Sequence, residues 1–380
     1  MKYRQRTLEQ KLKEYVDFFS VVAVTGPRQS GKSTLIKQHL KDYTYVSFDE
    51  GANVTLFYND PEKFMRIHHH KVIFDEVQKV PEIFDYLKLA VDEDRETAGK
   101  FILTGSSQFS LSKEISESLA GRIGLLTLLP YSYSEMPKKH LEDSLFFGAY
   151  PELVHKDYKL FDDWYASYIE TYIEKDLRTL ANVGDLRDFQ RLIQLLAANT
   201  SQILNYSMFS NALGVDVKTI TRWISILEAS YIIFLVPPYY KNLGKRIVKR
   251  PKVYFYDVGL VSHLCGISNR DLYEKGPMHG ALFENYLVAE CLKLLVHQKL
   301  HSKLYFYRTS HGVEVDLIID HRQYRELIEI KTSETFHSKM TKPIEGIIQP
   351  NDKGILLYQG KTRPYLENVQ IQNYKEYLAN

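Results

Sequence analysis

The chain has 380 residues, enough for two or three domains that each bury a core of their own. Its apolar content of 44% and charged content of 25% are usual for a soluble globular protein. The formal net charge of +2 excludes a strongly basic or acidic chain, so recognition of a charged partner must depend on local clusters. No apolar run approaches the roughly 18 residues that a membrane-spanning helix needs.

The N-terminal segment and the cysteines indicate a compartment. Residues 1–15 are charged and lack the apolar core of a signal peptide. The two cysteines, Cys265 and Cys291, have no metal-type spacing, and so few thiols in a chain of this size indicate a reducing environment. We therefore expect a cytoplasmic protein that has no contact with a membrane.

A charged helix over residues 1–20 is predicted to lead into the strongest motif of the chain. Residues 21–24 are all apolar, and residues 26–34 read GPRQSGKST, which contains the pattern G-x-x-x-x-G-K-[ST]. This is the phosphate-loop signature, and the apolar strand before it and the helix after it supply the required context. An ordinary glycine turn is the alternative.

In a phosphate loop, backbone N–H groups and the positive end of the following helix bind phosphate oxygens. Lys32 is predicted to reach the β- and γ-phosphates of ATP, and the Ser33 hydroxyl is predicted to be a ligand of Mg²⁺. The predicted nucleotide contacts are Gly26, Pro27, Arg28, Gln29, Ser30, Gly31, Lys32, Ser33 and Thr34.

Two further strands are predicted at residues 44–51 and 72–74, and the second of them ends in Asp75 and Glu76. In phosphate-loop ATPases an acid at this position supports Mg²⁺, which assigns that role to Asp75. Glu76 is then placed to polarise an attacking water. Two solvated acids at a strand end are the alternative. The run His68-His69-His70 cannot aim three adjacent rings at one ion, so we expect a solvated loop there.

The next strand, within residues 100–107, ends in Ser106 and Ser107, either of which would contact the γ-phosphate; a helix cap is the alternative. Arg122, flanked by glycines, suits either a finger that acts on a neighbouring subunit of a homo-oligomer or a pair with an internal carboxylate. Alternating strands and helices up to about residue 135 predict an α/β fold with a mostly parallel sheet. The phosphate loop would lie at its carboxyl edge.

From about residue 145 the pattern becomes helical, and a tyrosine stripe within residues 165–172 indicates packing. Residues 208–240 read as a helix, a glycine turn, a second helix and a strand, with a return strand at 252–259. These are the parts of a winged helix. The predicted DNA contacts are Lys218, Thr219 and Arg222 on the second helix, and Lys245, Arg246, Lys249 and Arg250 in a basic wing. A winged helix that only packs against protein is the alternative.

Six segments together resemble one group of proteins: GPRQSGKST, VIFDEVQKVP, LTGSS, SLAGRIG, GAYPE and YIEKDL. They are similar to the prokaryotic AAA-type ATPases of the archaeal-ATPase kind, whose C-terminal domain is of unknown function. The likeness extends through most of the first 180 residues and into the winged-helix region. The resemblance implies ATP hydrolysis and a link to nucleic acid, and it leaves the physiological substrate open.

The last hundred residues resemble the PD-(D/E)XK nucleases. Glu284 lies on a predicted amphipathic helix over residues 280–295, Asp316 on a predicted strand, and Glu329 and Lys331 on the next strand. Residues two apart on a strand share a face, so Glu329 and Lys331 would both point toward Asp316. The resemblance implies that these residues form a second Mg²⁺ site in which Lys331 assists a water. Half-exposed strands with alternating acids, or a nuclease-like domain that only binds, are the alternatives.

We therefore predict an ATPase domain over residues 1–140, a helical and winged-helix domain over 141–265, and a small α/β nuclease-like domain over 266–380. The expected function is Mg²⁺-dependent ATP hydrolysis coupled to DNA binding or remodelling. An ATP-dependent switch for protein partners and an ATP-regulated endonuclease are the alternatives.

Overall fold

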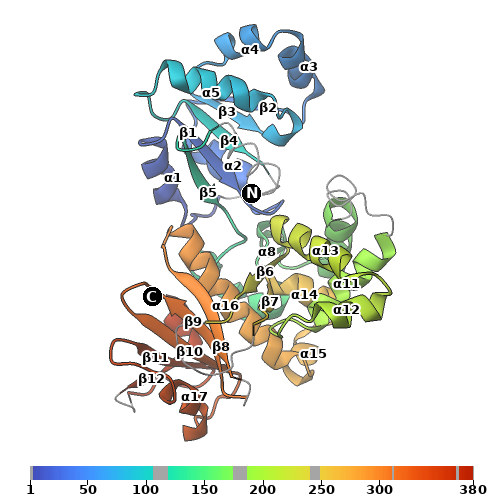
Figure 1. Cartoon of the computed structure of the whole chain (residues 1–380), viewed down its shortest axis with the longest axis vertical. Helices are drawn as coiled ribbons and strands as arrows, with labels where there is room; N and C mark the ends of the chain where they lie inside the picture. Colours follow the sequence, from blue (N-terminus) through green and yellow to red (C-terminus); the bar gives the residue numbers. More distant parts are fainter. Residues whose placement is uncertain are drawn as a thin grey trace.

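The computed structural model describes residues 3–105, 119–173, 186–239, 249–309, 312–364 and 368–379. The chain builds a first α/β part, then a mainly helical part, and then a second sheet with helices (Figure 1). The first part and the second sheet lie at opposite ends of the view, and the helix α16 (His279–His297) lies between them (Figure 1).

The first part is a five-stranded sheet in which every neighbouring pair is parallel. Its order is β2-β3-β4-β1-β5. The strands are β1 (Val21–Thr25), β2 (Thr44–Ser47), β3 (Val72–Asp75), β4 (Phe101–Thr104) and β5 (Ile123–Thr127). Because the strands are parallel, the loops that follow β1, β3 and β4 leave from the same edge.

Alternate residues of β1 enter two different cores, which explains why the strand is apolar throughout. Val22 and Val24 pack in a core with α1 (Glu9–Val16) and α2 (Lys32–His39). Val21 and Ala23 pack in a core on the other face, whose helices are α3 (Gly51–Asn59), α4 (Pro61–Ile67) and α5 (Ile83–Glu93). The predicted parallel sheet flanked by helices is confirmed. The predicted helix over residues 1–20 is shorter than expected, because residues 3–8 are not helical.

The second part is mainly helical and contains one antiparallel pair of strands, β6 and β7. Tyr165 and Tyr168 of the predicted tyrosine stripe are buried in its core. The elements are α7 (Ser144–Phe147), α8 (Pro151–His155), α9 (Phe161–Tyr168), a π-helical turn (Ile169–Ile173), α11 (Leu186–Ala198), α12 (Tyr206–Leu213), α13 (Val217–Ala229), β6 (Ile233–Val236), β7 (Lys252–Phe255), α14 (Val258–Leu264) and α15 (Arg270–Lys275).

The third part is a mixed sheet of order β12-β11-β10-β9-β8. The pairs β8–β9 and β9–β10 are antiparallel, whereas β10–β11 and β11–β12 are parallel. The elements are α16, β8 (Lys303–Arg308), β9 (Glu314–Asp320), β10 (Arg325–Lys331), α17 (Lys342–Glu345), β11 (Lys353–Tyr358), β12 (Val369–Asn373) and α18 (Tyr374–Ala379). A helical part and a separate mixed sheet therefore follow the first sheet, as predicted.

One hydrophobic core joins the second and third parts. It runs from Tyr131 through the helices of the second part to residues of β9, β10 and β11, and it ends at Tyr374. The helix α16 lies inside this core, and residues 285–291 are buried one after another. The prediction that this helix is amphipathic was therefore wrong, because all faces of its middle turns are buried.

None of the helices in the described ranges combines the length and the apolar character needed to cross a membrane.

Candidate nucleotide-binding site

The phosphate loop follows β1 and adopts a backbone that favours glycine. Gly26 has a φ of 135° and Gly31 a φ of 96°, and Gln29 is left-handed as well. A Cβ atom on Gly26 would lie 2.1 Å from the carbonyl oxygen of Leu128, so no other residue fits there. The fixed glycines of the motif are thus explained by close packing at Gly26 and by backbone conformation at Gly31.

Lys32 begins α2, and its side chain lies against the loop itself. It is 7% exposed, and its Nζ atom donates hydrogen bonds of 2.8 Å to the carbonyl oxygens of Gly26 and Pro27. Ser30 is fully buried and its hydroxyl has no hydrogen-bond partner in the described part of the chain, whereas Gln29 is exposed. The ammonium group therefore lies on the loop where a phosphate chain would need a positive charge.

Burial lowers the pKa of Lys32 to about 8, although the carboxylates of Glu76 and Asp75 oppose this shift. A lysine with this pKa is only partly charged in mildly alkaline solution. Nucleotide phosphates would favour its charged form, since an opposite charge within a few ångströms raises the pKa of an ammonium group.

We therefore expect ATP affinity to fall as the pH rises above the Lys32 pKa of about 8. Above that pH the free protein has lost the Lys32 proton, and binding must take it up again, so the dissociation constant should rise by up to about tenfold per pH unit. Calorimetry in two buffers of different ionisation enthalpy would measure the proton uptake. A dissociation constant that stays flat through this range would contradict the prediction.

Asp75 is the last residue of β3, and the Tyr45 hydroxyl forms hydrogen bonds with both Asp75 and Ser33. The hydroxyl of Tyr45 donates to Asp75, and so does the hydroxyl of Thr104 at the end of β4. Burial and the bond to Asp75 raise the pKa of Tyr45, whereas a hydrogen bond with Ser33 lowers it. The predicted metal residues thus come from two strand-end segments that meet at one edge of the sheet.

The oxygen atoms at this edge fit Mg²⁺. A serine hydroxyl and a carboxylate are the hard ligands that Mg²⁺ takes from protein, with phosphate and water oxygens completing its shell. Ser33 and Asp75 would hold the ion, and Thr104 and Tyr45 keep the Asp75 carboxylate in position. Neither Thr104 nor Tyr45 was predicted. The polar end of the strand before Ser106 was the available signal for Thr104.

Glu76 follows Asp75 with a left-handed backbone (φ 57°), which is uncommon for a residue other than glycine. Its N–H donates to the Thr104 hydroxyl at 3.4 Å, and its carboxylate accepts from the Gln78 amide. It also contributes the largest charge effect on Lys32. The carboxylate is therefore held at the phosphate-loop edge, where an attacking water would need a base.

The remaining residues predicted for this site differ in placement. Arg28 and Thr34 lie in the loop and on α2, and Thr34 is exposed. Ser106 and Ser107 lie outside the described residues. His69 and His70 are exposed, and the ring of His68 packs 4.6 Å from that of Phe64.

Arg122 lies at the opposite edge of the sheet from the phosphate loop, because it precedes β5, whose first residue pairs with the first residue of β1. Its Nε and Nη2 donate to the two carboxylate oxygens of Asp92 on α5 at 3.0 and 3.2 Å. These contacts match the internal-carboxylate alternative. A role on a neighbouring subunit stays a prediction.

The residues predicted to contact DNA lie in the second part. Lys218, Arg222, Lys249 and Arg250 are exposed. The hydroxyl of Thr219 instead donates to Asp216, whose side chain caps α13. Lys245 and Arg246 lie outside the described residues. The order α12, α13, β6 and β7 follows the predicted pattern, and its use as a winged helix stays a prediction.

The four residues of the predicted second metal site come together in the third part. The Lys331 ammonium lies 2.6 Å from Glu329 and 3.6 Å from Asp316, and Asp316 also accepts from the N–H of Ile330. Burial and Asp316 raise the pKa of Glu329 to about 8, against the effect of Lys331. Burial likewise raises the pKa of Glu284 to about 7.

A residue that sequence analysis missed supplies the positive charge in this cluster. The Lys252 ammonium, from β7, lies 2.9 Å from Glu284, 2.6 Å from Glu314 and 3.9 Å from Asp316, and its side chain is 3% exposed. In the described ranges, no three side chains of His, Cys, Asp or Glu are placed to hold a metal ion. These side chains do not fit Mg²⁺ in the arrangement they adopt, because the Lys252 ammonium lies among the acids.

Comparisons with known proteins divide the chain in three. Residues 19–137 match a family model described as an AAA domain. Residues 138–271 and 279–377 match two models, each described as a domain of unknown function (DUF8612 and DUF4143).

Similar proteins share most of the chain. An uncharacterised protein of Mycobacterium tuberculosis is 28% identical over 338 residues, covering 88% of this chain and 75% of its own length. One of Haemophilus influenzae is 25% identical, covering 75% and 77%. A solved Walker-type ATPase of Pyrococcus abyssi aligns with a TM-score of 0.47 at 15% identity, covering 70% of this chain and 96% of its own. Residues 19–137 thus combine the backbone of a phosphate loop with a match to an AAA family model.

Proposed function

We propose that the protein is a Mg²⁺-dependent ATPase that couples ATP binding and hydrolysis to the binding or remodelling of DNA. The observation that carries the ATPase proposal is the placement of Lys32, Ser33 and Asp75 at one edge of the parallel sheet, in a domain that matches an AAA family model. Phosphoryl transfer needs a cation for the phosphates, which Lys32 supplies, and ligands for a metal ion, which Ser33 and Asp75 supply. The backbone of the phosphate loop supplies N–H groups for the phosphate oxygens.

The roles follow from the contacts. Lys32 would exchange its two loop carbonyls for phosphate oxygens, which are stronger acceptors because they are charged. Ser33 and Asp75 would hold Mg²⁺, which neutralises charge on the phosphates when it is bound. Glu76 would orient a water and accept its proton at a carboxylate oxygen, with its backbone kept in place by Thr104.

The exposed basic residues of the second part support DNA as the partner. Lys218 and Arg222 lie one helical turn apart on α13, and Lys249 and Arg250 precede β7. Each can pair with a backbone phosphate, and such contacts make binding weaken with salt.

The test is the rate of ATP hydrolysis with duplex, branched and single-stranded DNA, together with DNA affinity at several salt concentrations. We expect DNA to stimulate hydrolysis. Replacing Lys218 and Arg222 by alanine should lower the slope of log affinity against log salt by about two. A matched control replaces Lys13 and Lys41, two exposed lysines of the first part, and should keep the slope. If none of these DNA forms changes the rate of ATP hydrolysis, and if no salt-sensitive DNA binding is measured, DNA is not the partner.

A second candidate is an ATP-dependent switch that binds protein partners. It is favoured by the acid cluster of the third part, where the Lys252 ammonium lies among the carboxylates that a nuclease would use to bind a metal ion. This candidate would be supported by slow hydrolysis whose rate DNA does not change, together with a change in the mass of the assembly in solution when ATP is added. A change of mass would also be the result expected if Arg122 acts on a neighbouring subunit.

A further inference from the structure

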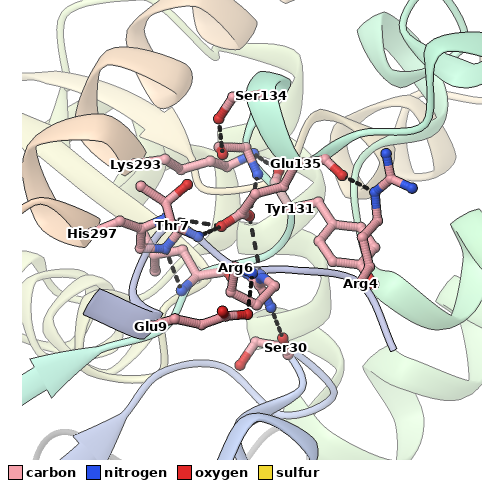
Figure 2. Close-up of polar contacts among 12 residues, drawn as sticks. Arg4, Arg6, Thr7, Glu9, Ser30, Tyr131, Ser134, Glu135, Lys293 and His297 are labelled. Carbon is pink, nitrogen blue, oxygen red and sulfur yellow. Dashed lines mark hydrogen bonds and ion pairs between the residues drawn. The ribbon is translucent and has the colours of Figure 1, made fainter. Parts of the chain in front are cut away.

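A buried arginine ties the phosphate loop to the chain that leaves β5. Arg6, just before α1, is 4% exposed. Its Nη1 donates to the carbonyl oxygen of Ser30 at 2.8 Å (Figure 2). Its Nη2 donates to the carbonyl oxygen of Leu129 at 2.6 Å. Gly31 passes close by, since a Cβ atom there would lie 3.5 Å from Nη1.

The same guanidinium is fixed by a buried carboxylate. Its Nε lies 3.1 Å from Glu135, and both side chains are 3% exposed. The Glu135 carboxylate also accepts from the backbone N–H groups of Thr7 at 2.6 Å and Ser132 at 2.9 Å. Burial alone would raise the pKa of Glu135, but Arg6 and these hydrogen bonds hold it below its usual value. The pair is therefore charged and fully enclosed.

His297, in the last turn of α16, contacts the same segment of chain, from Leu129 to Glu135. Its Nε2 accepts from the N–H of Leu129 at 3.1 Å, and its Nδ1 lies 3.9 Å from Glu135. Burial lowers the pKa of His297 to about 4, so the ring is neutral and carries its proton on Nδ1.

Two further residues of α16 fix the chain between Leu129 and Glu135. The Lys293 ammonium donates to the carbonyl oxygen of Tyr131 at 3.0 Å (Figure 2). Glu290 accepts from the N–H of Tyr133 at 2.6 Å. Glu290 and Lys293 are also paired, at 2.7 Å. Residues 129–135 thus lie between Arg6 on one side and α16 on the other.

We propose that Arg6 is a positioning residue for nucleotide binding, and that it transmits the state of the phosphate loop to α16 through residues 129–135. This role of Arg6 depends on the proposed ATP binding. A peptide unit is planar, so fixing the direction of the Ser30 carbonyl also fixes that of the Gly31 N–H, which belongs to the phosphate cradle. Movement of the loop upon binding must then move Arg6, and with it the chain that α16 holds.

The substitution Arg6→Lys tests whether Arg6 acts through the geometry of its guanidinium group or only through its positive charge. A lysine can keep the ion pair with Glu135, but its ammonium cannot reproduce the planar fork that also holds Ser30 and Leu129. We expect a lower melting temperature, because the buried carbonyl groups of Ser30 and Leu129 lose a donor, and an ATP dissociation constant of the folded variant raised about tenfold, the loss of one charged hydrogen bond. Lys11→Met, which removes an exposed ion pair of α1, is the control. A dissociation constant within about twofold of the wild type would overturn the proposal.

Hydrogen exchange on the wild type tests the transmission without any variant, and decides the matter should Arg6→Lys fail to fold. A non-hydrolysable ATP analogue should slow exchange in the phosphate loop, in residues 129–135 and in residues 290–297, and leave β11 unchanged. Protection confined to the loop would overturn the proposal. A wild type that binds no nucleotide would instead overturn the proposed function, and this inference with it.

Discussion

Replacing Glu76 by glutamine is expected to leave ATP bound and to lower the rate of hydrolysis by about a hundredfold or more, the usual contribution of a general base. Glutamine keeps the size of the side chain and its hydrogen-bonding oxygen, but it cannot accept the proton of an attacking water. The left-handed backbone at Glu76 and the contact of its N–H with Thr104 are retained, because neither depends on the side-chain charge.

Two measurements separate binding from turnover. Titration with a fluorescent nucleotide gives the dissociation constant, which should change little, and phosphate release gives the rate. Glu93→Gln makes the same chemical change at an exposed position on α5 and should hydrolyse ATP like the wild type. Undiminished hydrolysis by the Glu76 variant would show that this residue is not the base.

Replacing Lys252 by methionine is expected to destabilise the protein by about 3–5 kcal/mol, the range for removing one partner of a buried ion pair. Glu284 and Glu314 would lose the ammonium that lies 2.9 and 2.6 Å from them, while Asp316 remains nearby. Methionine fills similar space, so the loss would come from unpaired carboxylates more than from packing.

The stability that the Lys252→Met variant loses relative to the wild type should increase as the pH rises. Burial raises the pKa of Glu284 to about 7, and Lys252 opposes that rise. A carboxyl group whose pKa is raised by folding stabilises the native state fully below its unfolded pKa and loses that contribution as the pH rises through the folded value. Without Lys252 the folded pKa should be higher still, so the variant should lose most stability relative to the wild type in alkaline solution and least near about pH 5.

Chemical denaturation at several pH values would measure this effect. The double variant Lys252→Met/Glu284→Gln should recover part of the stability, because it also removes one of the unpaired charges. Lys353→Met, which replaces a lysine that is 55% exposed, should change little. A Lys252 variant as stable as the wild type at alkaline pH would mean that the acids do not need the ammonium.

The features that sequence analysis located are those set by local pattern. The apolar run before Gly26 follows from burial on both faces of a parallel sheet, and the glycines follow from the loop backbone. Glu329 and Lys331 face Asp316 because side chains two apart on a strand share a face. In each case neighbours in sequence determine the placement.

The residues that sequence analysis missed act across long distances in the chain. In the sequence, Arg6 is one charge among many in a charged segment, and Lys252 is the first residue of the predicted return strand, next to a basic wing. Their burial comes from partners more than thirty residues away, such as Glu135 and Glu284. The helix α16 was misjudged for the same reason, since the core that covers its second face comes from the middle of the chain.

The continuous core around α16 bears on how such proteins can diversify. An autonomous module can be exchanged between chains, but here the helical part and the mixed sheet complete one another's interior, and Lys252 of one neutralises acids of the other. Neither would keep its shape if transplanted alone. Recombination that preserves folding would have to carry both together and replace only the first part, to which they are attached.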